Sequence, residues 1–110
     1  MAPPQAPAQE QHAATIRCGV LTIDRERYRV TVSDQPVELT YMEFHVLLAI
    51  AERAGRVASY EELGREFWDD ASASTRRRLA VLVSRTRSKL GDAAPYLDTV
   101  HRVGYRLTSP

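Results

Sequence analysis

The side chains of this sequence best suited to chemistry are arginines that gather in its C-terminal third. Between positions 75 and 106, eight side chains are basic and two are acidic, which gives this segment a net charge of +6. The rest of the chain has seven basic and twelve acidic side chains, a net charge of −5, so the 110 residues together carry only +1. A local excess of positive charge favours a surface that binds a polyanion. From the charge alone, the same segment could also be a solvent-exposed helix whose charge asymmetry has no function.

Most of these arginines fall on a helix predicted over 75–90 and closed by Gly91. One stripe of this helix would dock it on a core; the stripe consists of Leu79, Val83, Thr86 and Leu90. The opposite face has no acidic residue; it consists of Arg77, Val81, Ser84 and Ser88, flanked by Arg78 and Arg85. A docked helix with such an outward face meets the requirements for entering the major groove of DNA.

The residue types on this face are suited to reading base edges. An arginine can donate two parallel hydrogen bonds to guanine, and a valine can pack on the methyl group of thymine. From the helical phase, Arg85 and Val81 are the expected base readers, whereas Ser84 could bond either a base or a phosphate. Arg77 and Arg78 in the first turn could meet either backbone or bases, and Arg87 points sideways, towards a phosphate or an internal ion pair.

A hairpin is predicted after this helix, with strands over 98–100 and 105–107. The tip between them offers His101 and Arg102. An arginine at such a tip could enter the minor groove, where the negative potential is enhanced when the groove is narrow. Taken alone, the hairpin could also be a plain exposed turn.

The elements that must position these side chains come earlier in the chain. Short stretches rich in β-branched residues predict a small antiparallel sheet, with strands at 20–23, 28–32 and 37–39 and a turn at 33–36. Capping boxes at Thr40–Glu43 and Ser59–Glu62 begin two helices, the first of which is expected to end at Gly55. This order predicts an α+β fold, a winged helix-turn-helix with an N-terminal antiparallel sheet, three helices and a C-terminal β-hairpin wing.

Composition indicates the domain boundaries and the cellular compartment. Residues 1–15 are rich in Ala, Pro and Gln and are expected to be a disordered tail or linker before a winged-helix domain over 16–110. No apolar run approaches the roughly 20 residues of a membrane span, and the start does not read as a secretory signal, so we expect a cytoplasmic protein without a membrane partner. Cys18 is the only cysteine and is expected to be a small core residue.

Four segments, taken together, resemble the DNA-binding effector domain of the OmpR/PhoB family of bacterial two-component response regulators. The family patterns "LT..EF.LL", "GRV.S...L...W", "SRLR.KL" and "TVRGVGYRL" correspond to 39–48, 55–68, 84–90 and 99–107. The resemblance covers about 17 to 108. It implies binding to double-stranded promoter DNA, often as head-to-tail pairs on direct repeats. The family's receiver domain is not in this sequence, which fits either an excised domain or a protein that never had one.

The resemblance also implies roles for individual residues. Trp68 and Arg77 match phosphate contacts, and Val81 and Arg85 match base-facing positions. Positions that contact DNA in the family also include Arg78 and Arg87 in the helix and Thr99 and His101 in the wing. The loop from 69 to 76 can contact RNA polymerase in family members; the candidates here are Asp69, Asp70, Ser72 and Ser74.

Two departures from the family pattern affect the choice of target sequence. The usual "VDVH" of the recognition helix is Leu79-Ala80-Val81-Leu82 here, so the acid and the histidine are both lost. The usual "RG" of the wing is His101-Arg102, which moves the basic group by one residue.

Two other classes of function are compatible with a small globular domain. An enzyme is disfavoured because the sequence has no glycine-rich phosphate loop and no metal-ligand spacing; His12, His45 and His101 are scattered, Ser59 is explained as a helix cap, and neither a metal nor a cofactor is expected. A winged-helix protein–protein interaction module without specific DNA binding is the stronger alternative. A steep loss of binding with salt would distinguish DNA binding from it.

Overall fold

A computed structural model describes residues 14–109 of the chain. His12 and nearly all of the predicted tail at 1–15 lie outside the described residues. Thr15 lies inside and begins the first strand.

The N-terminal sheet has four antiparallel strands in sequence order: β1 (Thr15–Cys18), β2 (Leu21–Asp24), β3 (Arg29–Val32) and β4 (Gln35–Val37). The prediction missed β1 as a strand and placed the last strand too late. The turn is only Ser33 and Asp34, which both have positive φ, and Pro36 is already part of the edge strand β4. A proline is tolerated there because an edge strand need not use every backbone N–H.

Three helices follow the sheet: α2 (Tyr41–Ala51), α3 (Tyr60–Trp68) and α4 (Ala73–Leu90). Both predicted capping boxes are present; Glu43 N donates to Thr40 Oγ1 over 3.2 Å and Glu62 N to Ser59 Oγ over 3.0 Å. The first helix ends at Ala51, earlier than predicted, and Gly55 lies in the turn beyond it. Ser72 caps α4, so this helix begins two residues before the predicted start.

The C-terminal sheet forms the wing. A short 3-10 helix, η1 (Gly91–Tyr96), leads into the hairpin of β6 (Leu97–Val100) and β7 (Gly104–Leu107). The two-residue strand β5 (Ala58–Ser59), which was not predicted, pairs with β7 and gives the strand order β5-β7-β6. Gly104 permits this pairing, because a Cβ atom there would lie 2.0 Å from the carbonyl oxygen of Ala58.

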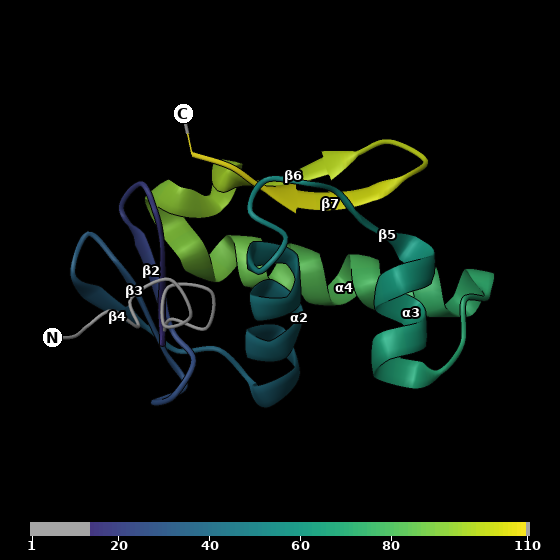
Figure 1. The fold of residues 1–110 in the computed structure, drawn as a ribbon, viewed down its shortest axis with the longest axis horizontal. Helices are drawn as coiled ribbons and strands as arrows, with labels where there is room; N and C mark the ends of the chain where they lie inside the picture. Colours follow the sequence, from purple (N-terminus) through teal and green to yellow (C-terminus); the bar gives the residue numbers. More distant parts are fainter. Residues whose placement is uncertain (1–13, 110) are drawn as a thin grey trace, which may run out of the picture.

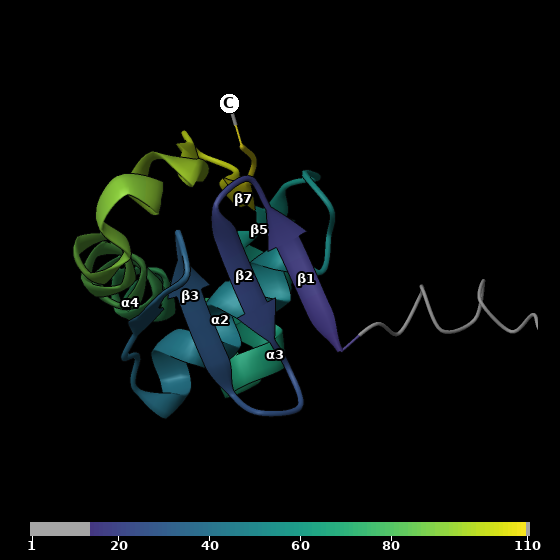
Figure 2. The same ribbon diagram turned by 90° about the vertical axis from the view of Figure 1, so that its left-hand side faces the viewer.

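The layers meet around α2, which is buried on most of its surface. Figure 1 shows α4 running along the long axis of the molecule, with α2 and α3 across it and the β6–β7 hairpin beside it. Figure 2 shows β1, β2 and β3 side by side, and Figure 1 shows this sheet at the opposite end of the molecule from the tip of the β6–β7 hairpin. Cys18 packs partly buried against the core, as expected. No helix within residues 14–109 has the length and apolar character needed to cross a membrane.

Candidate nucleic-acid interface

Helix α4 has a buried face and an exposed face, as the sequence predicted. The stripe that docks it on the core is fully buried; it consists of Leu79, Val83, Thr86 and Leu90. Arg77, Arg78 and Arg85 are exposed on the other side, and Val81 keeps 46% of its surface open to solvent. A valine that stays exposed among arginines is available to a ligand.

A hollow of about 460 Å³ lies on this exposed side and is here called the recognition hollow. It is lined by Trp68, Ser74, Arg77, Arg78, Val81, Leu82 and Arg85. Trp68 at the end of α3 is half-buried and packs on the core, and the Arg78 guanidinium carbon lies 5.9 Å from the centroid of its ring. This cation–π contact joins the two helices at the edge of the hollow.

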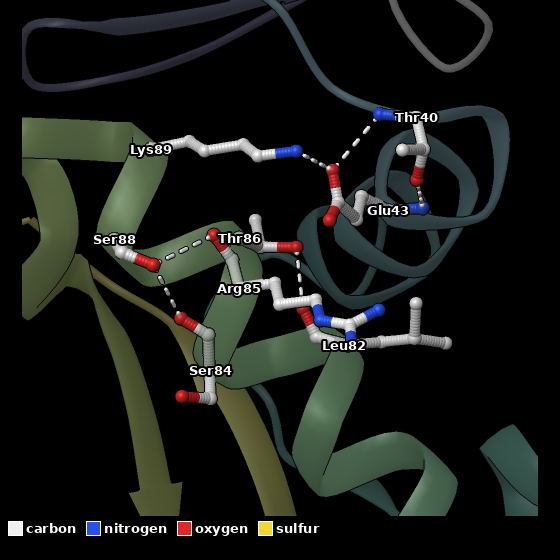
Figure 3. A network of polar contacts seen from close by, with 8 residues as sticks. All are labelled: Thr40, Glu43, Leu82, Ser84, Arg85, Thr86, Ser88 and Lys89. Atoms are coloured by element: carbon white, nitrogen blue, oxygen red, sulfur yellow. Dashed lines mark hydrogen bonds and ion pairs between the residues drawn. The ribbon is translucent and has the colours of Figure 1, made fainter.

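Five of the residues expected to contact DNA therefore meet in one place; they are Trp68, Arg77, Arg78, Val81 and Arg85. Ser84 and Ser88 do not line the hollow. Figure 3 shows Ser88 turned back on its own helix, where its hydroxyl donates to the carbonyl oxygens of Ser84 and Arg85 over 3.1 Å each. The lining is thus rotated from the predicted face towards Leu82, which sequence reasoning did not select.

The signal for Leu82 was its spacing, four residues after Arg78 and three before Arg85. Helix residues at those separations lie on one face. The sequence analysis placed Leu82 neither in the docking stripe nor on the outward face, and in the structure Leu82 packs partly against the core. Only the position of Trp68 on α3 determines that the remaining surface of Leu82 faces the recognition hollow.

A second hollow, of about 270 Å³, lies between α4 and the wing and is here called the wing hollow. It is lined by Tyr60, Arg76, Arg77, Ala80, His101, Arg102 and Tyr105. The Arg76 guanidinium carbon lies 4.9 Å from the centre of the Tyr60 ring, which holds this arginine towards the wing. Arg76 was not among the residues chosen from the sequence, because helical phase alone does not show that Tyr60 and the wing lie beside it.

The wing tip is exposed, as predicted, from His101 to Val103. Arg102 has a φ of +68°, the left-handed region that favours glycine, so the arginine occupies a strained backbone position. Burial raises the pKa of the Tyr105 hydroxyl, and Tyr60 reinforces this effect while Arg87 opposes it. Tyr105 is therefore a neutral hydrogen-bonding group at the floor of the wing hollow.

Arg87 and Thr99, which both match DNA-contacting positions of the family, form a hydrogen bond with each other. Arg87 Nε donates to the carbonyl oxygen of Leu97 over 2.6 Å, and an Arg87 terminal nitrogen donates to Thr99 Oγ1, also over 2.6 Å. The internal contact expected as one possibility for Arg87 is present, although its partners are a carbonyl and a hydroxyl and not a carboxylate. Arg87 thus fastens α4 to β6.

The loop before α4 is shorter than predicted. Ser74 was assigned to this loop, but it lies within α4 and lines the recognition hollow, because Ser72 caps the helix. Asp69 and Asp70 remain exposed in the loop. Asp70 accepts hydrogen bonds from Ser72 Oγ over 2.6 Å and Thr75 Oγ1 over 2.5 Å, and these bonds lower the pKa of its carboxyl group.

The other end of α4 is held by an ion pair with α2. Lys89 Nζ lies 2.7 Å from Glu43 Oε1, which also accepts from the backbone N–H of Thr40 (Figure 3). Burial, the largest influence, raises the pKa of Glu43, but the contacts with Lys89 and Thr40 outweigh it and leave the pKa below its usual value. No cluster of three or more potential metal ligands occurs among residues 14–109.

Residues 34–107 match the sequence pattern of the family described as "Transcriptional regulatory protein, C terminal". The chain belongs to this family. It is 35% identical over 108 residues to the transcriptional regulatory protein CseB of Streptomyces avermitilis, an alignment that covers 96% of this chain and 45% of CseB. It is 32% identical over 97 residues to the two-component response regulator PhoP of Pseudomonas aeruginosa, with 86% of this chain and 43% of PhoP covered. The chain therefore spans less than half the length of these curated relatives.

Solved structures share the fold. The DNA-binding domain of Klebsiella pneumoniae RstA, solved in complex with the RstA box, superposes with a TM-score of 0.76 at 30% identity over 86% of this chain and 96% of that one. The Thermotoga maritima response regulator DrrB, an OmpR/PhoB homolog, gives a TM-score of 0.79 at 27% identity, covering 96% of this chain and 50% of DrrB. The predicted winged-helix fold and the resemblance to the OmpR/PhoB family are confirmed.

Proposed function

We propose that this chain binds double-stranded promoter DNA in a sequence-specific manner and acts in the regulation of transcription. The observation that carries the proposal is the recognition hollow, in which Arg77, Arg78 and Arg85 surround the exposed Val81 with no carboxylate in the lining. Helix α4 enters the major groove, and the β6–β7 hairpin lies on the adjacent backbone or minor groove. The DNA-binding domain of RstA, which has the same fold, was solved in complex with the RstA box, and this supports DNA binding by the present chain.

The roles follow from position. Arg78, Val81 and Arg85 meet base edges, and the phosphate contacts come from Trp68, Arg77 and Ser84. His101 and Arg102 at the exposed wing tip contact backbone or minor groove. Arg76 adds a cation to the wing hollow beside Arg102.

The finer partner assignments belong to this proposal. Asp69, Asp70 and Ser72 form an exposed loop beside the interface, which suits contact with RNA polymerase on the same promoter. Two copies bind direct repeats head to tail. Such a regulator works in the cytoplasm, where promoter DNA is available to it.

The experiment is selection of bound duplexes from a random DNA pool, followed by measurement of affinity against salt concentration. A recovered motif with a steep salt dependence is expected, because each neutralised phosphate contributes about 0.9 to the slope of log K against log salt. Arg29→Ala is a matched control, since Arg29 is an exposed arginine on the N-terminal sheet, away from both hollows. No enriched motif together with salt-independent behaviour would contradict DNA binding.

One observation favours a second candidate function, a protein-interaction module. Trp68, Val81 and Leu82 give the recognition hollow an apolar floor that an apolar side chain of a partner protein could also fill. The arginines around it argue for DNA, and the selection experiment separates the two.

A further inference from the structure

We infer that Leu82, together with Val81 and Trp68, reads the 5-methyl groups of thymine, so that the preferred DNA site contains thymine next to the bases contacted by arginine. This inference rests on the proposed function. It assigns a specificity-determining role to Leu82, a residue that was not among the DNA contacts predicted from the sequence.

Three apolar side chains form the floor of the recognition hollow. Val81 and Leu82 are consecutive in α4, and both line the recognition hollow with Trp68 of α3. Val81 is 46% exposed, and Leu82 and Trp68 are half-buried against the core, which fixes their orientation. The floor is therefore a firm apolar surface that presents no hydrogen-bonding group other than the indole N–H of Trp68.

The positive charge around the apolar floor favours DNA as the ligand of the recognition hollow. Arg77, Arg78 and Arg85 stand at the rim, and within residues 14–109 none of the three forms an ion pair. An apolar protein partner would leave these cations without counterions in a buried interface, which is costly. A DNA major groove supplies phosphates and guanine edges for the arginines and thymine methyl groups for the floor.

The chemistry of the groove then sets the preference. Thymine is the base with a methyl group on its major-groove edge, whereas the other bases are distinguished there by hydrogen-bond donors or acceptors. A donor or acceptor pressed against Leu82 would lose water without gaining a partner, which costs free energy. The floor therefore favours thymine both by contact with its methyl group and by disfavouring the alternatives.

The test removes the methyl group alone. In a duplex recovered by the selection experiment, each thymine is replaced in turn by deoxyuridine, and affinity is measured at fixed salt by fluorescence anisotropy. We expect at least one replacement within the contacted sequence to weaken binding about fourfold, the effect of withdrawing one buried methyl-sized group. Thymines in the flanks serve as internal controls and should show no change.

Two variants connect this effect to Leu82. Leu82→Ala should bind the thymine and deoxyuridine duplexes equally at the sensitive position, whereas Leu82→Met, which keeps the apolar contact, should retain the difference. Thermal unfolding of each variant checks that the fold is intact, and Leu82→Met provides the comparison if the alanine variant is destabilised.

The outcomes separate this inference from the proposed function. An enriched motif whose thymines all tolerate deoxyuridine, or a Leu82→Ala variant that keeps the full penalty, overturns the role of Leu82 while DNA binding stands. A motif that lacks thymine in the contacted sequence does the same. Failure to enrich any motif overturns the proposed function, and the thymine inference falls with it.

Discussion

Lys89 near the end of α4 and Glu43 in the first turn of α2 form an ion pair of 2.7 Å in which the carboxylate is only 2% exposed. Glu43 also closes the capping box of α2 by accepting from Thr40 N. One carboxylate therefore caps the central helix and fixes the recognition helix against it. Lys89 keeps 40% of its side chain exposed, so the cost of burying charge falls mainly on Glu43.

This pair predicts an asymmetry between two substitutions. Lys89→Met leaves Glu43 as a buried carboxylate without its cation, and should lower the free energy of unfolding by about 2–4 kcal/mol at pH 7. Glu43→Gln removes the charge, leaves an amide oxygen for Thr40, and should cost less, about 1–2 kcal/mol. Urea unfolding measures both. Equal losses, or a larger loss for Glu43→Gln, would contradict the buried-charge explanation.

The same pair predicts how stability depends on acid. The pKa of Glu43 is lower in the folded chain than its ordinary value, so folding favours the ionised form. Its stabilising contribution is complete above the ordinary carboxyl pKa, about 4.3, and is lost as the pH falls through the lower folded value. Between pH 6 and pH 3, wild type should therefore lose more stability than Glu43→Gln. Parallel pH profiles for the two proteins would show that Glu43 is not responsible.

Local rules predicted part of this molecule well. The capping boxes at Thr40 and Ser59 and the buried stripe of α4 depend on residues within a few positions of one another, so the sequence alone reveals them. Strand β5 could not be found this way, because its two residues become a strand only by pairing with β7, more than 40 positions later. The start of α4 was missed because Ser72 and Ser74 lie in one polar segment, and either serine could serve as the N-cap of the helix.

In the candidate site too, some features follow from local sequence and others depend on contacts between distant elements. Helical phase placed Val81 and Arg85 correctly on the exposed face, because phase is a property of the helix itself. Helical spacing was compatible with an exposed Leu82, but the aromatic rings beside Leu82 and Arg76 belong to α3, which helical phase does not place. It also left Arg87 undecided, because its partners belong to β6.

Arg87 should contribute to stability more than to the salt dependence of binding. Its contacts with Leu97 and Thr99 are internal, so Arg87→Ala should cost about 1.5–3 kcal/mol in unfolding free energy by releasing the wing from α4. Arg77→Ala removes an exposed cation and should instead lower the salt slope by about 1 with little loss of stability. Denaturant unfolding and salt titration on both variants test the distinction. A salt slope that falls equally in both would assign Arg87 to the phosphate contacts.

Arg85 should determine sequence choice. It is exposed in the recognition hollow and is expected to donate to a guanine edge, so Arg85→Ala should reduce discrimination between the selected motif and a single-base variant at that position by about 1–3 kcal/mol. Arg29→Ala, the control outside the interface, should leave discrimination unchanged. The measurement is affinity for the matched and mismatched duplexes at one salt concentration. Undiminished discrimination by Arg85→Ala would remove this residue from base reading.

Arg102 should show opposite effects on stability and on binding. Its φ of +68° is unfavourable for any side chain with a Cβ atom, so Arg102→Gly should raise the free energy of unfolding by up to about 1 kcal/mol. The same change removes a cation from the wing hollow and should weaken binding to all sequences alike. Arg102→Ala is the matched comparison, because it loses the charge but keeps the backbone strain. If Arg102→Gly and Arg102→Ala are equally stable, the backbone conformation at the tip is not strained. If neither weakens binding, the wing tip does not contact DNA through this arginine.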